Sequence, residues 1–426
     1  MSNKPNGIAI IGGGLAGLTA AYWIRRTTDL PITIFESEKR VGGRVSTHGD
    51  PPGEHGARYV LGSELKIKLA QQEFQNYGLP NGKSLGWLLK HELRISTHNL
   101  GGKGLPHISF LEEGDPRPFH RSAPWVRQTY PEAAWVFRQT RSPHLPTNIS
   151  FETWVRRHVS LDRRSRALLD VLLLGEICAP WKHVTARYAM ECLDSLINPN
   201  ESWHSVRGGS NTIAKKLLTD HAYTVRLSAP VRKVRRTRNG KITVSVRHGH
   251  MVRPHSFQAV IVSCPDAHRL VAELPSPRSH YHAYISFLFS FRQRPSLADF
   301  PQVDLTNGLY TDHPLANYLE TAKTPQGWTL RVLAASADRY LTLRNHELKQ
   351  RCLKVFRQLG LSPHYQGLHI RRWKHGLACG GTPRKFDKVE DGIYVCGDRY
   401  GLWPSMACAM VSGAWAADVV VTELGH

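Results

Sequence analysis

Three glycines and one glutamate near the start of the chain have the spacing of a dinucleotide-binding motif. Gly12, Gly14 and Gly17 stand in the order G-x-G-x-x-G, and Glu36 follows nineteen residues after the last of them. The first glycine permits a tight turn, the second lets the backbone approach a pyrophosphate, and the third lets a helix pack against a strand. A glutamate at this distance accepts hydrogen bonds from an adenosine ribose and disfavours a 2′-phosphate. The predicted chemistry is the binding of FAD or NAD rather than NADP.

The elements that must position these residues form a strand–helix–strand unit. Residues 8–11 and 32–35 are short apolar runs, and residues 15–24 carry apolar side chains at helical spacing. Leu15 and Ala16 would then lie at the helix N-terminus, where free backbone N–H groups attract phosphate. Ser37 directly follows the acidic residue and belongs to the same expected ribose site.

A second glycine turn follows a few residues later, as Gly42-Gly43-Arg44. Paired glycines let the backbone pass close to a pyrophosphate, and an arginine supplies a forked, positively charged donor. Residues 54–59 then read Glu-His-Gly-Ala-Arg-Tyr. These motifs together resemble the FAD-dependent oxidoreductases of the flavin amine oxidase superfamily, which includes amine and amino-acid oxidases, polyene desaturases and renalase-like enzymes.

The resemblance rests on a dinucleotide fingerprint, an acidic ribose ligand, a G-G-R turn and an E-x-G-A segment. It implies FAD as the cofactor, and it places Gly56, Ala57 and Arg58 beside the flavin. Toward the C-terminus it implies that Gly397 and Asp398, at the end of an apolar run, reach the ribityl and phosphate region.

Two further cofactor contacts follow from the same resemblance. Ser405 and Met406 begin an apolar helix whose N-terminus points at the flavin N1–C2=O edge, where negative charge develops on reduction. Val231, in the segment 229–234, would give main-chain contacts to the adenine.

The expected fold class is α/β, with a Rossmann-type FAD-binding domain and a discontinuous substrate domain of mixed sheet and helices. The FAD-binding domain takes residues 1–62, 203–265 and 385–426, and the substrate domain takes residues 63–202 and 266–384. Within the substrate domain, residues 100–147 are rich in Pro, Gly, Arg and His, which predicts an irregular surface excursion.

Three residues are candidates for catalysis. Arg58 could clamp a substrate carboxylate, as an arginine near this point does in amino-acid oxidases, or it could contact the flavin or the protein. Trp373 could form a wall of the substrate cavity, and His375 could accept a proton near neutral pH. The alternative for the last two is a packed tryptophan and a surface histidine.

Two departures from the amine-oxidase pattern weaken that assignment. The strand expected over residues 282–289 has no lysine, and Ser286 or Ile285 stands where the family usually has the lysine that helps oxygen reoxidise the flavin. Ser405 stands where one of a pair of aromatic side chains normally faces the flavin.

The leading hypothesis is an FAD-dependent enzyme that takes a hydride from a C–N bond of a small amine or amino acid and gives an imine. The first alternative is a C–C desaturase or a renalase-like oxidase of a reduced nicotinamide, and the second is a flavoprotein without activity. Arg58 and the positive charge of the chain favour an anionic amino acid. Molecular oxygen or another acceptor would take the electrons.

The composition of the chain excludes several other classes of protein. The chain has 426 residues, a formal net charge of +22, and seven cysteines without a C-x-x-C pair, so neither disulfides nor a metal site is expected. The basic residues are spread along the chain, which argues against a nucleic-acid module. No apolar run reaches the roughly 18 residues of a membrane span. We expect a cytoplasmic protein, with the oligomeric state left open, a homodimer included.

Overall fold

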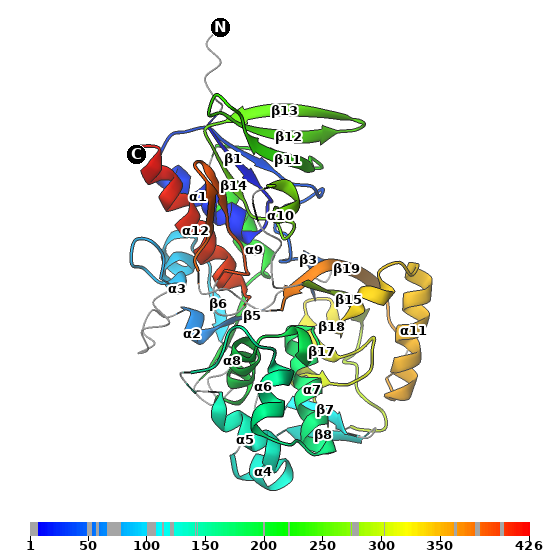
Figure 1. Ribbon diagram of the computed structural model, residues 1–426. Helices are drawn as coiled ribbons and strands as arrows, with labels where there is room; N and C mark the ends of the chain where they lie inside the picture. The colour runs from blue at the N-terminus through cyan, green and yellow to red at the C-terminus, as the bar shows by residue number, and fades with distance from the viewer. Residues whose placement is uncertain are drawn as a thin grey trace.

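The computed structural model describes most of the chain (Figure 1). The described residues are 7–48, 53–56, 59–65, 78–99, 108–112, 115–119, 123–140, 142, 144–198, 201–219, 222–272, 274, 281–301, 303–361, 364–379, 384–400 and 404–426. Ala57 and Arg58, two of the predicted site residues, lie outside this set.

The first sheet is the predicted dinucleotide-binding sheet, and its strands come from three distant parts of the chain. Its order is β10 (Tyr223–Arg226), β2 (Ile32–Phe35), β1 (Ile8–Ile11), β14 (Ala259–Val262), β21 (Ile393–Val395) and β20 (Asp387–Glu390). The first five strands are parallel, and β20 is antiparallel to β21. Parallel strands are buried on both faces, which explains why β1 and β14 are apolar at every position.

Helices α1 (Leu15–Thr27) and α12 (Met406–Glu423) pack on one face of this sheet and on each other. They pack closely at Gly413, where a Cβ atom would lie 2.1 Å from the carbonyl oxygen of Ala16. A three-stranded antiparallel sheet of β11 (Val231–Arg236), β12 (Ile242–His248) and β13 (Met251–Phe257) packs against the other face. The predicted strand–helix–strand unit and the α/β fold class are confirmed.

Helix α12 has one property that was not expected from the sequence. It is 18 residues long with a mean hydropathy of 1.2, which suffices for a membrane span by length and composition. However, 72% of it is buried inside the protein, as in the core helix of a globular domain. The helix therefore carries little weight as evidence for a membrane span.

The second large sheet is mixed and forms the core of the other half of the protein (Figure 1). Its order is β19 (Gly367–Ala378), β15 (Tyr281–Phe291), β18 (Gly327–Ala334), β17 (Tyr318–Thr324), β16 (Leu309–Tyr310), β7 (Ile108–Glu112) and β8 (Asp115–Phe119). Side chains alternate along each strand. On β15, Phe287 and Phe289 point to a core that includes Phe356 of α11 (Asn345–Gln358), whereas Tyr284 lies on the opposite face, toward the helical segment.

The helical segment covers that opposite face with α4 (Ala123–Thr129), α5 (Pro131–Gln139), α6 (Phe151–His158), α7 (Arg163–Ile177) and α8 (Ala186–Ile197). Side-chain caps set where three of these helices begin, because Ser150, Asp162 and Thr185 accept hydrogen bonds from the first turns of α6, α7 and α8. The prediction of an irregular excursion over residues 100–147 is wrong, since this segment forms β7, β8, α4 and α5.

Smaller elements connect the two halves. A three-stranded sheet of β5 (Tyr59–Leu61), β9 (Trp203–Val206) and β6 (Thr97–Asn99) lies between them, as does the hairpin of β3 (Thr47–His48) and β4 (Gly53–Glu54). The domain boundaries given by the sequence stay a prediction.

Candidate active site

Two glycine loops face each other at one end of a large cavity. Gly12 has φ +106°, and Gly42 and Gly43 have φ +104° and +56°, values that a residue with a side chain rarely adopts. The Gly42 amide donates to the carbonyl oxygen of Gly13 at 2.7 Å. A Cβ on Gly43 would lie 3.1 Å from the Cα of Gly14, so the loops touch through bare backbone.

Helix α1 begins between these loops. Gly14 is its N-cap, and no side chain caps the first turn. Uncapped backbone N–H groups with the positive end of the helix dipole make a ready site for phosphate. Gly17 does not line the cavity; a Cβ there would lie 2.1 Å from the carbonyl oxygen of Gly12, so this glycine lets the helix pack closely, as predicted for it.

Glu36 is buried beside the same loops, with 7% of its surface exposed. One carboxylate oxygen accepts from the Gly13 amide at 2.7 Å, and the other accepts from the Glu38 amide at 2.8 Å and the Ser37 hydroxyl at 3.2 Å. Because a carboxylate has about four acceptor sites, these three donors fix its orientation and leave capacity for a hydroxyl of a ligand.

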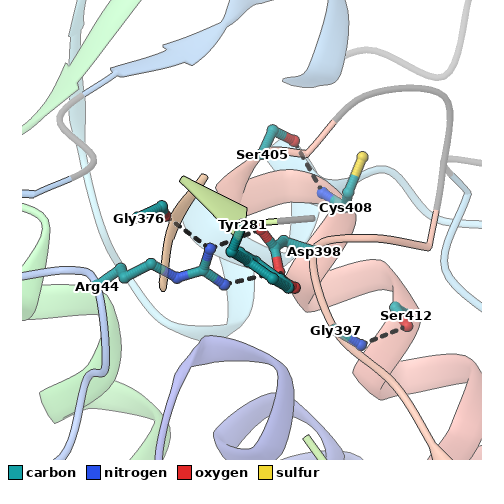
Figure 2. Close-up of polar contacts among 8 residues, drawn as sticks. All are labelled: Arg44, Tyr281, Gly376, Gly397, Asp398, Ser405, Cys408 and Ser412. Carbon is teal, nitrogen blue, oxygen red and sulfur yellow. Dashed lines mark hydrogen bonds and ion pairs between the residues drawn. The ribbon is translucent and has the colours of Figure 1, made fainter. Parts of the chain in front are cut away.

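Arg44 and Asp398 both line the cavity, and they form a bidentate ion pair (Figure 2). The two N–O distances are 2.7 and 2.6 Å, and Arg44 also donates to the carbonyl oxygen of Gly376 at 2.9 Å. The Tyr281 hydroxyl donates to Asp398 at 3.1 Å. Burial opposes the charge of Arg44, but Asp398 outweighs burial and raises the pKa of Arg44. This cluster ties together segments that are far apart in sequence.

The N-terminus of α12 lies next to this ion pair (Figure 2). Ser405 caps the helix by accepting from the Cys408 amide at 3.0 Å, and Met406 opens the first turn. The Gly397 amide donates to the Ser412 hydroxyl at 3.0 Å, which fixes the turn that carries Asp398.

The cavity has a volume of about 560 Å³ and runs from the glycine loops to the face of the mixed sheet. Predicted residues that line it are Gly12, Gly14, Leu15, Ala16, Glu36, Ser37, Gly42, Gly43, Arg44, Gly56, Trp373, His375, Gly397, Asp398, Ser405 and Met406. Val231 lies on β11 and does not line it.

Trp373 and His375, two of the predicted catalytic residues, both lie on β19. The Trp373 ring packs against Tyr284, with ring centroids 5.9 Å apart, and its indole N–H is buried without an acceptor among the described residues. His375 lies 3.3 Å from a carboxylate oxygen of Asp266. Burial lowers the pKa of His375 from its usual 6.5, although Asp266 opposes this shift. His375 is therefore neutral at pH 7.

Part of the cavity wall was not predicted from the sequence, and it includes Tyr284, Tyr318 and Arg331. These residues come from three neighbouring strands, and only the register of the sheet shows that they share one face. Alternation along each strand was a usable signal, but the side chains facing the cavity could not be chosen without knowing which face α11 covers.

A buried polar chain lies on the same face of the sheet. Ser286 on β15 is fully buried and lies 3.1 Å from Nδ1 of His55, whose Nε2 lies 2.8 Å from Nδ1 of His369. Ser286 stands at the position where the resemblance to amine oxidases predicts a lysine. The position is thus filled by a hydroxyl held next to the segment that carries Gly56.

Comparison with known proteins gives the class of this site. A family model for flavin containing amine oxidoreductase matches residues 15–420. A putrescine oxidase triple mutant has a similar structure, with a TM-score of 0.72, 17% identity and coverage of 98% of this chain and 99% of that one. Cyclohexylamine oxidase from Brevibacterium oxydans IH-35A has a TM-score of 0.71 and 14% identity, with coverage of 99% and 100%.

Sequence likeness to an L-amino acid oxidase is confined to one segment. Over 79 residues the chain is 29% identical to the L-amino acid oxidase of Cerastes cerastes, and the match spans 18% of this chain and 15% of that relative. The fold is that of flavin-dependent amine oxidases. Because the family model covers nearly the whole chain, the protein belongs to the flavin-containing amine oxidoreductase family, and it is an oxidoreductase.

The cofactor is FAD, as the sequence predicts, and the cavity fits such a group. The glycines of the two loops carry no side chain, so they leave the N-terminus of α1 open to the cavity. The buried indole N–H of Trp373 lacks an acceptor among the described residues, which a bound group with ring nitrogens and carbonyl oxygens can supply.

Proposed function

We propose that this enzyme oxidises the C–N bond of a small amine or amino acid. The observation that carries the proposal is the continuity of the cavity, which joins the dinucleotide-binding loops to a wall of tyrosines and a tryptophan on the mixed sheet. A cofactor and a small substrate can therefore meet in one continuous cavity. Membership of a family of amine oxidoreductases supports a carbon–nitrogen bond as the target.

The cofactor contacts follow from the geometry of the loops. We assign the pyrophosphate to the N-terminus of α1 and to the two glycine turns, and the adenosine ribose to Glu36. Asp398, held by Arg44, would contact the part of the cofactor that links the pyrophosphate to the ring system. Ser405 and Met406, at the N-terminus of α12, would present the positive end of the helix to the flavin.

In the oxidation, one C–H bond and one N–H bond of the substrate break and a C=N bond forms. When bound, the flavin accepts the hydride. The protein must then take the proton from nitrogen, and His375 is our candidate because it lines the cavity and is neutral at pH 7. Trp373 and Tyr284 form a wall that excludes water from the reacting carbon. Water later hydrolyses the released imine.

One observation favours a second candidate. β15 carries Ser286 instead of a lysine, and this strand differs in that respect from the amine-oxidase pattern. A C–C desaturase or an oxidase of a reduced nicotinamide does not require that lysine. We therefore keep these reactions as the alternative, and we propose that an acceptor other than molecular oxygen takes the electrons efficiently.

Anaerobic mixing of the FAD-loaded enzyme with candidate donors tests the proposal. The donors are a panel of amino acids, primary amines and reduced nicotinamides, and the readout is loss of the flavin absorption band near ~450 nm. Loss of the band with an amine or amino acid supports the proposal. Reduction by a nicotinamide alone would support the alternative, and a loaded flavin that no amine reduces would contradict C–N oxidation.

A further inference from the structure

Arg331 holds an unusual position in the cavity. It projects from β18, lines the cavity, and is only half-buried, yet its Nε–H is fully buried without an acceptor among the described residues. One Nη donates to the carbonyl oxygen of Gly56 at 3.1 Å, and the guanidinium carbon lies 5.9 Å from the centre of the Tyr318 ring. Since a guanidinium has five N–H donors, most of its capacity is available to a ligand.

Most of the other charged groups of the cavity wall already have a partner, whereas Lys374 is exposed and has no ion pair among the described residues. Arg44 is paired with Asp398, Arg371 with Glu38 at 2.7 Å, and Glu191 with Arg187 at 2.6 Å. Arg40 donates to the carbonyl oxygens of Val41, Gly43 and Val45. Each of these groups therefore has a partner within the protein.

Two more glutamates of the wall are also hydrogen-bonded. Glu176 accepts from the Tyr310 hydroxyl, and Glu64 accepts from the Leu61 amide at 2.9 Å. By contrast, no carboxylate lies within ion-pair distance of Arg331 in the part of the chain that the structure describes. Its cross-strand neighbour Glu320 is buried but does not line the cavity.

The surroundings of Arg331 make this cation costly without a counter-ion. Tyr284, Tyr318, Leu333 and Cys178 line the cavity around it, and Tyr284 and Cys178 are close enough for its charge to oppose the burial that raises the pKa of each. A charge held against mostly apolar walls is stable only when an opposite charge and hydrogen bonds offset its lost hydration.

We propose that Arg331 binds the carboxylate of the substrate, which makes the substrate an amino acid or another amine that carries an acid group. The planar guanidinium matches a carboxylate with two parallel N–H···O bonds. The guanidinium is positioned by its hydrogen bond to the carbonyl oxygen of Gly56 and by its contact with the Tyr318 ring. This inference deepens the proposed function and rests on it for the identity of the substrate as an amine.

Equilibrium dialysis of the FAD-loaded enzyme against benzoate and against benzamide tests the site without turnover. The two probes have nearly the same shape and differ in charge. The wild-type enzyme should bind benzoate at least about tenfold more tightly than benzamide, the effect of one charge-assisted hydrogen bond. Arg331→Met should abolish this preference, and Arg331→Lys should retain only part of it. The control Arg292→Met, at an exposed position after β15, should behave as wild type.

Equal binding of the two probes to the wild-type enzyme would overturn the proposal, as would a full preference in Arg331→Met. If Arg331→Met does not fold with FAD, Arg331→Lys decides, because an unchanged preference there would show that the fork is not used. The outcome is independent of catalysis. A preference for benzoate in an enzyme that no amine reduces would leave the anion site standing and refute the proposed reaction.

Discussion

The ion pair between Arg44 and Asp398 allows a quantitative prediction. Asp398→Asn keeps the shape of the side chain and one acceptor oxygen, but it removes the charge that faces a buried guanidinium. The Asp398 side chain is 7% exposed and that of Arg44 is 25% exposed. Removing one partner of a buried pair costs about 3–5 kcal/mol, and the partial exposure of Arg44 places the expected loss at about 3 kcal/mol.

The assay is urea unfolding of the FAD-free protein, followed by tryptophan fluorescence, together with the dissociation constant for FAD. Asp391→Asn is the matched control, since this aspartate is also paired with basic residues but is 71% exposed, and its substitution should leave both quantities unchanged. Equal stability of the Asp398 and Asp391 variants would refute the reasoning. Adding Arg44→Met to Asp398→Asn should cost less than the two single changes summed, because the unpaired charge is then gone.

Three further outcomes follow from the site. Gly43→Ala should weaken FAD binding about tenfold or more, because the φ of Gly43 is +56° and a Cβ would lie 3.1 Å from the Cα of Gly14. The control Gly82→Ala should not weaken FAD binding, since Gly82 has φ +73° but nothing lies within 4 Å of a Cβ there. Equal effects of the two substitutions would contradict the contact between the two loops. Since burial lowers the pKa of His375 below 6.5, the rate of flavin reduction in stopped-flow measurements should fall only below pH 6.5. His375→Gln should slow the reduction and remove this pH dependence. An unchanged pH profile in the variant would exclude His375 as the proton acceptor. With Ser286 in place of a lysine, the reduced enzyme should be reoxidised more slowly by oxygen than by a quinone, and the reverse order would argue against our proposal for the acceptor.

Local spacing explains why the dinucleotide-binding unit could be predicted from the sequence. The turn at Gly12, the helix that starts at Leu15 and the strand that ends before Glu36 depend on residues close together in the chain, so the motif defines the local structure. The bidentate partner of Arg44 could not be inferred in the same way. Asp398 lies 354 residues away, and only the folded sheet and α12 bring the two together.

The wrong and the missing predictions also result from contacts between segments that are far apart in the sequence. Residues 115–119 read as a loop because Pro116 and Pro118 lack the N–H that a strand needs, yet β8 is an edge strand, where prolines are tolerated. Arg331 was missed because its importance comes from what surrounds it: the register of β15, β17 and β18 decides which side chains share the cavity face. Such pairings between distant segments are not encoded by local patterns.

The most direct test of C–N oxidation is a single anaerobic turnover in which ammonia is measured against reduced flavin. A primary amine or amino acid that reduces the bound FAD should yield, after hydrolysis of the imine, one ammonia for each flavin reduced. This ratio is expected only if the bond oxidised is carbon–nitrogen. Full reduction of the flavin without ammonia would contradict the central claim and favour oxidation of a carbon–carbon bond or of a nicotinamide.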